Sequence, residues 1–167
     1  MARLLRALLF TLPGVAFLAY WVIADPGYEA SAAQTKWPYV LGFSGALATL
    51  GVALPVFGGQ VTGRNARRWS AVAGAAVGAN SLTNIIEDGV GVEGMFMVFV
   101  AGTAVMIVAL IGLSVVIATA PGSTSRLLAL IPVGTVVATV AFVAAGGPIM
   151  AATWIGAAAA TSRRTPR

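Results

Sequence analysis

The sequence predicts an all-α integral membrane protein, a polytopic helical bundle that forms a single domain over residues 1–167. Two observations carry this prediction. Hydrophobic residues make up 59% of the chain and charged residues only 9%, whereas charged residues make up about a quarter of a soluble domain. The apolar residues also form several runs long enough to cross a bilayer as a helix, which takes roughly 20 residues. The same composition excludes a disordered chain, which would be poor in apolar residues.

Four apolar runs predict the first four spans, joined by short loops. The first run ends at Asp25-Pro26-Gly27, the second at Gly58-Gly59 and the fourth at Pro121-Gly122, all of which are turn signals. The third run is shorter and more polar than the others. The predicted spans cover residues 4–24, 38–57, 69–86 and 95–120.

The first run also has features of a secretory signal peptide, because Arg3 and Arg6 precede an apolar segment. We favour an uncleaved helix, since the run is long, no A-x-A pattern lies near Ala24, and further spans follow. The run is therefore expected to remain as the first span.

The positions of the arginines predict the orientation of the bundle. If Arg3 and Arg6 are cytoplasmic, every other arginine ahead of the tail also falls on the cytoplasmic side, and all five acidic residues fall on the outer side. Only Lys36 departs from this pattern, which follows the positive-inside rule. Both termini are therefore expected in the cytoplasm. The predicted topology determinants are Arg3, Arg6, Arg64, Arg67, Arg68, Arg126, Arg163, Arg164 and Arg167.

Residues 127–160 allow two interpretations. A cytoplasmic basic tail requires an even number of spans, which predicts two helices, 127–145 and 148–160, with a turn at Gly146-Gly147-Pro148. The alternative is one long helix, giving five spans and an outer tail. Trp154 favours the alternative, because Trp prefers membrane interfaces and only a long helix would place it near one. We prefer six spans.

Aromatic residues mark the expected membrane boundaries. Tyr20 and Trp21 end the first span, Trp37 and Tyr39 begin the second, and Trp69 begins the third. Tyr and Trp are enriched at membrane–water interfaces. We therefore expect the first four in an outer interfacial belt and Trp69 at the inner face.

The third span carries the candidate site. Asn80, Asn84, Glu87 and Asp88 lie at i, i+4, i+7 and i+8, and Thr83 at i+3, so an α-helix would place them on one face. Such a polar strip cannot face lipid without a large free-energy penalty. It would line a polar pocket that opens outward, or it would bond to neighbouring helices, as small amides do in membrane bundles.

The same span contains a G-x-x-x-G pair, Gly74 and Gly78. Small residues at this spacing let two helices approach closely. We expect the pair to pack against another helix of the same chain, with a homodimer contact as the alternative.

Residue types that the chain lacks limit its chemistry. There is no Cys and no His, which excludes thiolate catalysis, Ser-His-Asp catalysis and the usual zinc and haem ligands. Gly89, Gly91 and Gly94 match G-x-G-x-x-G, but in an expected loop between membrane helices rather than in the βαβ unit that a dinucleotide site needs. We expect no catalytic residues, no metal and no cofactor.

The predicted function is that of a non-enzymatic membrane protein acting by association, as a small subunit, a scaffold or a lipid-interacting bundle. Its partners would be the lipid bilayer, another membrane protein or a second copy, and the net charge of +5 is ascribed to orientation in the membrane rather than to nucleic-acid binding. The alternative is a small permease or channel that uses the outward-facing polar strip. All but one of the basic residues are arginine, as is typical of GC-rich bacteria, which places the chain in a bacterial plasma membrane.

Overall fold

The computed structural model describes residues 2–24, 36–61, 63–120 and 123–162. They form helices and turns, and no strand occurs among them. The α-helices are α1 (Ala2–Ala24), α2 (Lys36–Gln60), α3 (Arg64–Asn84), α4 (Phe96–Thr119), α5 (Ser123–Leu128), α6 (Leu130–Val140) and α7 (Gly147–Ser162), and two short π-helices are η1 (Ile85–Val90) and η2 (Phe142–Gly146). The all-α prediction is confirmed.

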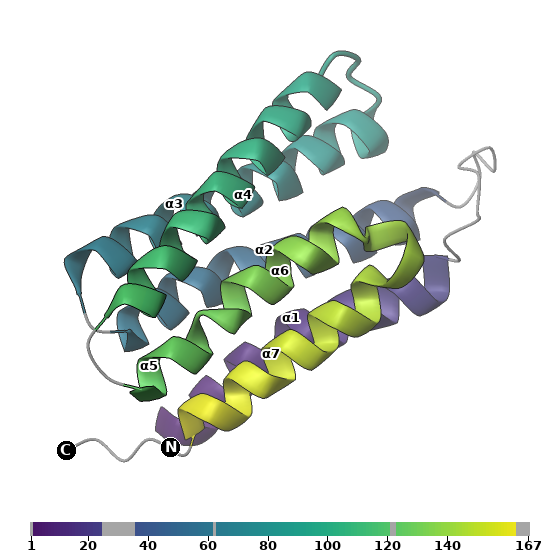
Figure 1. Ribbon diagram of the computed structural model, residues 1–167. Coiled ribbons are helices and arrows are strands. Elements are labelled where there is room, and N and C mark those ends of the chain that lie inside the picture. Colours follow the sequence, from purple (N-terminus) through teal and green to yellow (C-terminus); the bar gives the residue numbers. More distant parts are fainter. Residues whose placement is uncertain (1, 25–35, 62, 121–122, 163–167) are drawn as a thin grey trace.

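The long helices form a closed ring. Each packs against two neighbours in the order α1, α2, α3, α4, α6, α7 and back to α1. Figure 1 shows them side by side along one axis, with α3 and α4 at one edge, α2 and α6 in the middle, and α1 and α7 at the other edge. The ring encloses an apolar core that includes Phe10, Phe57 and Trp154, whose rings lie within 6.1–6.2 Å of one another.

Three helical segments are long and apolar enough to cross a membrane: Leu4–Ile23, Trp37–Gln60 and Phe96–Thr119. Large apolar side chains on their outer surfaces are exposed, among them Leu41, Val108 and Ile111. A continuous apolar surface of this kind is typical of a protein whose solvent is lipid. The described helices are therefore compatible with an integral membrane protein.

Local sequence accounts for several helix boundaries. α4 ends at Thr119 because Ala120, which precedes Pro121, adopts an extended backbone. Gly91 and Gly94 have φ angles of 85° and 90°, in the left-handed region that glycine tolerates, and they turn the chain between η1 and α4. α3 begins at Arg64, five residues before the predicted start at Trp69, because arginine and alanine are good helix formers even where the sequence is polar.

Residues 127–160 contain two helices rather than one. α6 and α7 pack against each other as a hairpin (Figure 1), which contradicts the single long helix. The turn lies over residues 141–146, where Ala145 leaves the helical conformation, somewhat earlier than predicted. α7 consequently extends from Gly147 to Ser162.

Trp154 is buried in the core, so its use as an indicator of a membrane interface was wrong. Its side chain is 0% exposed, and its Nε1 donates to Thr135 Oγ1 at 3.1 Å. A buried Trp needs such a partner for its N–H. Trp154 thus joins α7 to α6 instead of marking an end of the bundle.

The segment before α6 is broken at Ala129. Pro132 has no N–H to donate to the carbonyl of Leu128, which weakens the helix at this point. Ser114 Oγ of α4 donates to the Ala129 carbonyl at 3.3 Å, so a neighbouring helix supports the break. The broken helix packs against α4 and α7.

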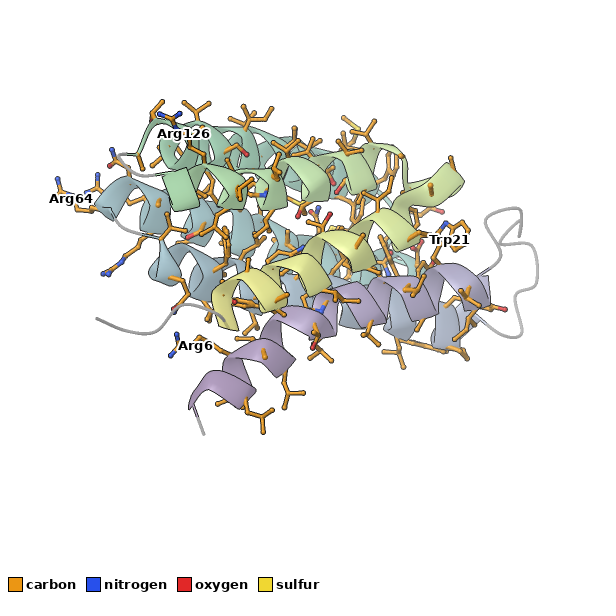
Figure 2. The ribbon with its side chains drawn as sticks, turned by 60° about the horizontal axis from the view of Figure 1, so that its bottom comes forward. Arg6, Trp21, Arg64 and Arg126 are labelled. Carbon is orange, nitrogen blue, oxygen red and sulfur yellow. The ribbon has the colours of Figure 1, made fainter. Side chains whose placement is uncertain are left out.

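Charged side chains separate to the two ends of the bundle. Arg6 lies at the end where α1 begins, donating to Gln60 Oε1 at 2.8 Å, and Arg64 and Arg126 lie at the same end (Figure 2). The acidic residues Glu87 and Asp88, on η1, follow the far end of α3. Of the predicted topology determinants, the side chain of Arg3 and all of Arg163, Arg164 and Arg167 lie outside the described residues.

Candidate functional site

The two amides of the α3 strip bond to different helices. Asn84 Nδ2 donates to Ser44 Oγ at 3.0 Å and to the Val40 carbonyl at 3.4 Å, both on α2. Ser81 Oγ donates to the Ser44 carbonyl at 2.8 Å. All of these side chains are buried. This part of the strip is therefore a buried, hydrogen-bonded contact between α2 and α3.

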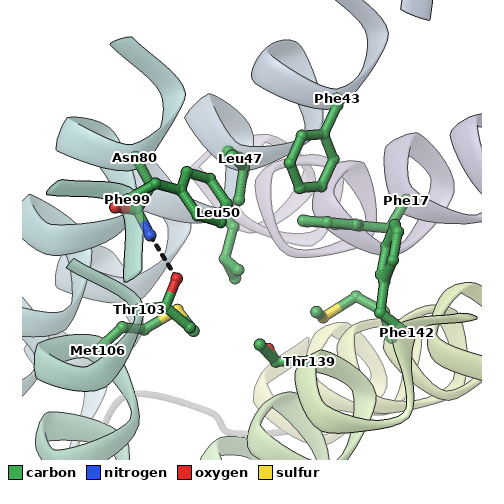
Figure 3. A pocket seen from close by; sticks show the side chains of 11 residues that line it. Phe17, Phe43, Leu47, Leu50, Asn80, Phe99, Thr103, Met106, Thr139 and Phe142 are labelled. Atoms are coloured by element: carbon green, nitrogen blue, oxygen red, sulfur yellow. Dashed lines mark hydrogen bonds between the residues drawn. The ribbon is translucent and has the colours of Figure 1, made fainter. Parts of the chain in front are cut away.

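Asn80 bonds to α4 on the other side. Its amide nitrogen donates to Thr103 Oγ1 at 2.9 Å (Figure 3). With the amide turned over, the nitrogen donates to the Phe99 carbonyl at 3.3 Å and the oxygen accepts from the Thr103 hydroxyl at 2.9 Å. Both orientations hold Asn80 against α4, next to Gly102, where a Cβ would clash with the Asn80 side chain.

The remaining strip residues, Thr83, Glu87 and Asp88, have different surroundings. Thr83 is buried and donates to the Ala79 carbonyl of its own helix at 2.9 Å. Glu87 and Asp88 belong to the π-helix η1, whose i→i+5 hydrogen bonds change the angle between successive side chains. The α-helical spacing on which the expectation of one face rests therefore ends at Asn84. Glu87 is half-buried and Asp88 is exposed.

The G-x-x-x-G pair packs against α2 of the same chain. A Cβ added at Gly74 would lie 2.7 Å from the Gly51 carbonyl oxygen and 2.7 Å from Pro55 Cδ. A Cβ added at Gly51 would lie 3.3 Å from the backbone nitrogen of Gly78. Gly51 and Gly74 therefore set the close approach of α2 and α3 beside Gly78.

A cavity of about 210 Å³ lies inside the ring, between the side of α3 that carries Asn80 and the α6–α7 hairpin (Figure 3). Every helix of the ring contributes to it, with η2 continuing from α6. The lining is mainly apolar. It consists of Phe17, Phe43, Leu47, Leu50, Asn80, Phe99, Thr103, Met106, Thr139, Phe142 and Met150.

Aromatic rings form one wall of the cavity. The ring centroid of Phe43 lies 6.4 Å from that of Phe17, 6.2 Å from that of Phe99 and 5.6 Å from that of Phe142. Tyr20 stacks on Phe142 at 6.1 Å. Trp21 Nε1 donates to the Phe142 carbonyl at 3.1 Å, which holds η2 against α1. Tyr20 and Trp21, expected in an interfacial belt, thus also close the core.

The polar atoms of the lining come from three uncharged side chains. Asn80 and Thr103 are paired with each other, and Thr139 Oγ1 donates to the Thr135 carbonyl at 2.8 Å. Behind Thr139, the Thr135 hydroxyl donates to Ile131 and accepts from Trp154. None of the eleven lining residues is ionisable, so the cavity suits an uncharged occupant.

Sequence reasoning found Asn80 but missed the cavity. Its four phenylalanines belong to four different segments, and nothing in their local pattern distinguishes them from ordinary core residues. Across the described parts of the chain, no group of three acidic side chains is placed to hold a metal ion.

Comparisons with protein-family models, with curated proteins and with solved structures give no match for this chain.

Proposed function

We propose that this chain is a non-enzymatic protein of the bacterial plasma membrane that crosses the bilayer six times and acts by association, with lipid or with another membrane protein. One observation carries the choice over a permease: the buried amides of α3 are bonded to α2 and α4. A strip that conducts a polar solute would need hydrogen-bonding groups left free for that solute. With no more than one Asn80 N–H left free, the strip supports the bundle rather than a path for a polar solute.

The polar helix α3 can cross the bilayer in this arrangement. Its buried face carries the polar residues that bond to α2 and α4. Its exposed face along the middle of the helix carries apolar residues, namely Ala71, Val72, Ala75, Ala79 and Leu82. Lipid would therefore meet an apolar surface, although the helix as a whole is more polar than the three segments Leu4–Ile23, Trp37–Gln60 and Phe96–Thr119.

The α6–α7 hairpin supplies the last two spans. α7 has 16 residues, about 24 Å at the rise of an α-helix, against a hydrocarbon thickness of about 30 Å. Its contacts with α1 and α6 bury one side of it, and local thinning of the bilayer would accommodate the difference. With an even number of spans, the chain returns to the end of the bundle where Arg6, Arg64 and Arg126 lie.

The separation of charge supports an orientation with the arginine end in the cytoplasm. Arg64, Arg67, Arg68 and Arg126 lie around the bundle end where α1 begins and α7 ends. Lys and Arg in short loops favour the cytoplasmic side. Glu87 and Asp88 would then face outward.

The second candidate function is a small permease. The observation that favours it is the position of the cavity, which all the helices of the ring surround. Against it, the lining contains four phenylalanines and no charge, which suits an apolar molecule better than a hydrated solute.

Single-cysteine labelling separates the two functions, since the chain contains no native Cys. Asn84→Cys and Asn80→Cys would be treated in intact cells with a membrane-impermeant maleimide, with exposed Asp88→Cys and exposed Asn65→Cys as outer and inner references. We expect labelling at 88 in intact cells, labelling at 65 only after permeabilisation, and protection at 80 and 84.

Each outcome bears on a separate part of the proposal. Labelling at 80 and 84 from outside would contradict the association function and favour a permease. Labelling at 65 from outside would reverse the orientation. A further variant, Ser162→Cys, reports on the span number: labelling from outside would contradict six spans.

A further inference from the structure

The lining of the central cavity defines a ligand chemistry that the proposed function does not contain. Apart from Asn80, Thr103 and Thr139, the cavity is bounded by aromatic, leucine and methionine side chains. An apolar cavity of about 150 Å³ is enough to hold benzene. This cavity, at about 210 Å³, has space for one six-membered ring with a short substituent.

The shape of the wall favours a flat ring. Phe17, Phe43 and Phe142 meet at interplanar angles of 85°, 81° and 54°, so both edges and faces are presented to the interior. Aromatic pairs are stabilised by such edge and offset geometries. Met106 and Met150 complete the lining, and their flexible thioethers adapt to different ring substituents.

Asn80 supplies a hydrogen-bond donor. An Asn amide carries two N–H groups, and in either orientation the bonds to α4 use the nitrogen once. The side chain is 2% exposed and lines the cavity (Figure 3). In the orientation of Figure 3, in which the nitrogen donates to Thr103, the second N–H can be satisfied by an acceptor oxygen on the occupant.

Water is a poor occupant by comparison. A buried water needs two to four polar partners, and apart from the second Asn80 N–H, the lining groups already bond to one another or to their own helices. A charged molecule is also disfavoured, because no lining side chain would compensate its charge.

We propose that the central cavity is a binding site for a neutral ring-bearing molecule with one hydroxyl or carbonyl oxygen, whose ring packs against Phe17, Phe43 and Phe142 and whose oxygen accepts a hydrogen bond from Asn80. Such a molecule partitions into hydrocarbon and can be supplied from the bilayer. The site adds a ligand to the proposed function and does not depend on the orientation or the number of spans, so the labelling experiment and the binding experiment fail independently.

The test uses fluorine NMR of the full chain in lipid nanodiscs with three probes. They are 4-fluorobenzyl alcohol, 4-fluorotoluene, which lacks the oxygen, and 4-fluorobenzylammonium, which is charged. We expect a saturable bound resonance for the alcohol that protein-free nanodiscs do not show. The toluene should bind about tenfold more weakly, the value of one hydrogen bond, and the ammonium should give no bound resonance.

A matched pair of variants locates the site. Thr139→Phe places a ring in the cavity and should abolish the bound resonance. Val140→Phe makes a similar change at the next residue, which is 75% exposed on the outer surface, and should retain it.

Three results would overturn the proposal. These are the absence of a saturable resonance in the unmodified protein, an equal affinity for alcohol and toluene, and retention of binding in Thr139→Phe. The absence of a saturable resonance is measured on the unmodified protein. The proposal can therefore be contradicted even if Thr139→Phe does not fold.

Discussion

Asn80 and Asn84 lie one helical turn apart on α3, yet their surroundings differ. Asn84 is held between Ser44 and Val40 in the close contact of α2 with α3. Asn80 pairs with α4 and borders the cavity. Identical side chains on one helix therefore have different roles. Asn84 joins α3 to α2, whereas Asn80 joins α3 to α4 and also borders the cavity.

The largest effect is expected where α2 and α3 approach most closely. Gly74→Ala places a Cβ 2.7 Å from the Gly51 carbonyl oxygen and from Pro55, so one of the two helices must shift. We expect the unfolding free energy to fall by about 1–3 kcal/mol. Gly78→Ala is the control, because its added Cβ has no neighbour within 4 Å, and it should be neutral or slightly stabilising. Reversible unfolding in mixed detergent micelles measures both. Equal losses would show that close packing at Gly74 is not what joins the two helices.

The second largest effect is expected at Asn84, whose amide bonds to α2. Asn84→Leu removes two hydrogen bonds to α2 and leaves Ser44 Oγ without this partner. We expect a loss of about 1–2 kcal/mol in unfolding free energy, measured in the same assay. A variant as stable as the unmodified chain would contradict the structural role of Asn84.

A smaller effect on stability is expected at the cavity. Asn80→Leu removes the pair with Thr103, but the apolar side chain can occupy part of the adjoining space. The loss should stay near 0.6 kcal/mol, the average for hydrogen bonds between membrane helices. If Asn80→Leu proves more destabilising than Asn84→Leu under identical conditions, the contrast between the two amides is reversed.

An effect of the same order as that of Asn80→Leu is expected at the buried indole. Trp154→Phe keeps the ring packing with Phe10 and Phe57 but removes the hydrogen bond to Thr135. The Thr135 hydroxyl still donates to Ile131, so we expect a loss of about 0.5–1.5 kcal/mol. Tryptophan fluorescence provides a second check, since a blue-shifted component from the buried Trp154 should disappear.

The sequence predicts the helices better than their contacts. Pro121-Gly122 and the Gly-rich turn before α4 mark boundaries that the structure retains, because Pro and Gly act locally. The start of α3 was misplaced because apolar periodicity does not detect a helix that begins with Arg64. The π-helix η1, which carries Glu87 and Asp88, has no marker in the sequence.

The candidate site was less predictable, since it depends on which helices become neighbours. That Asn80 cannot face lipid follows from its polarity alone, but its pairing with Thr103 requires α3 to lie against α4. Trp154 was misplaced for the same reason: its average preference for interfaces is overridden by a specific partner, Thr135, on the adjacent helix.

The most direct test of the central claim, that the α3 amides serve to join helices, is a double-mutant cycle between Ser44 and Asn84. Unfolding free energies would be measured for Ser44→Ala, Asn84→Leu and the double variant. If the two side chains are hydrogen-bonded, we expect a favourable coupling of about 0.6–1.7 kcal/mol, from the average to the largest value for hydrogen bonds between membrane helices. Additive losses, with no coupling between the two side chains, would contradict it.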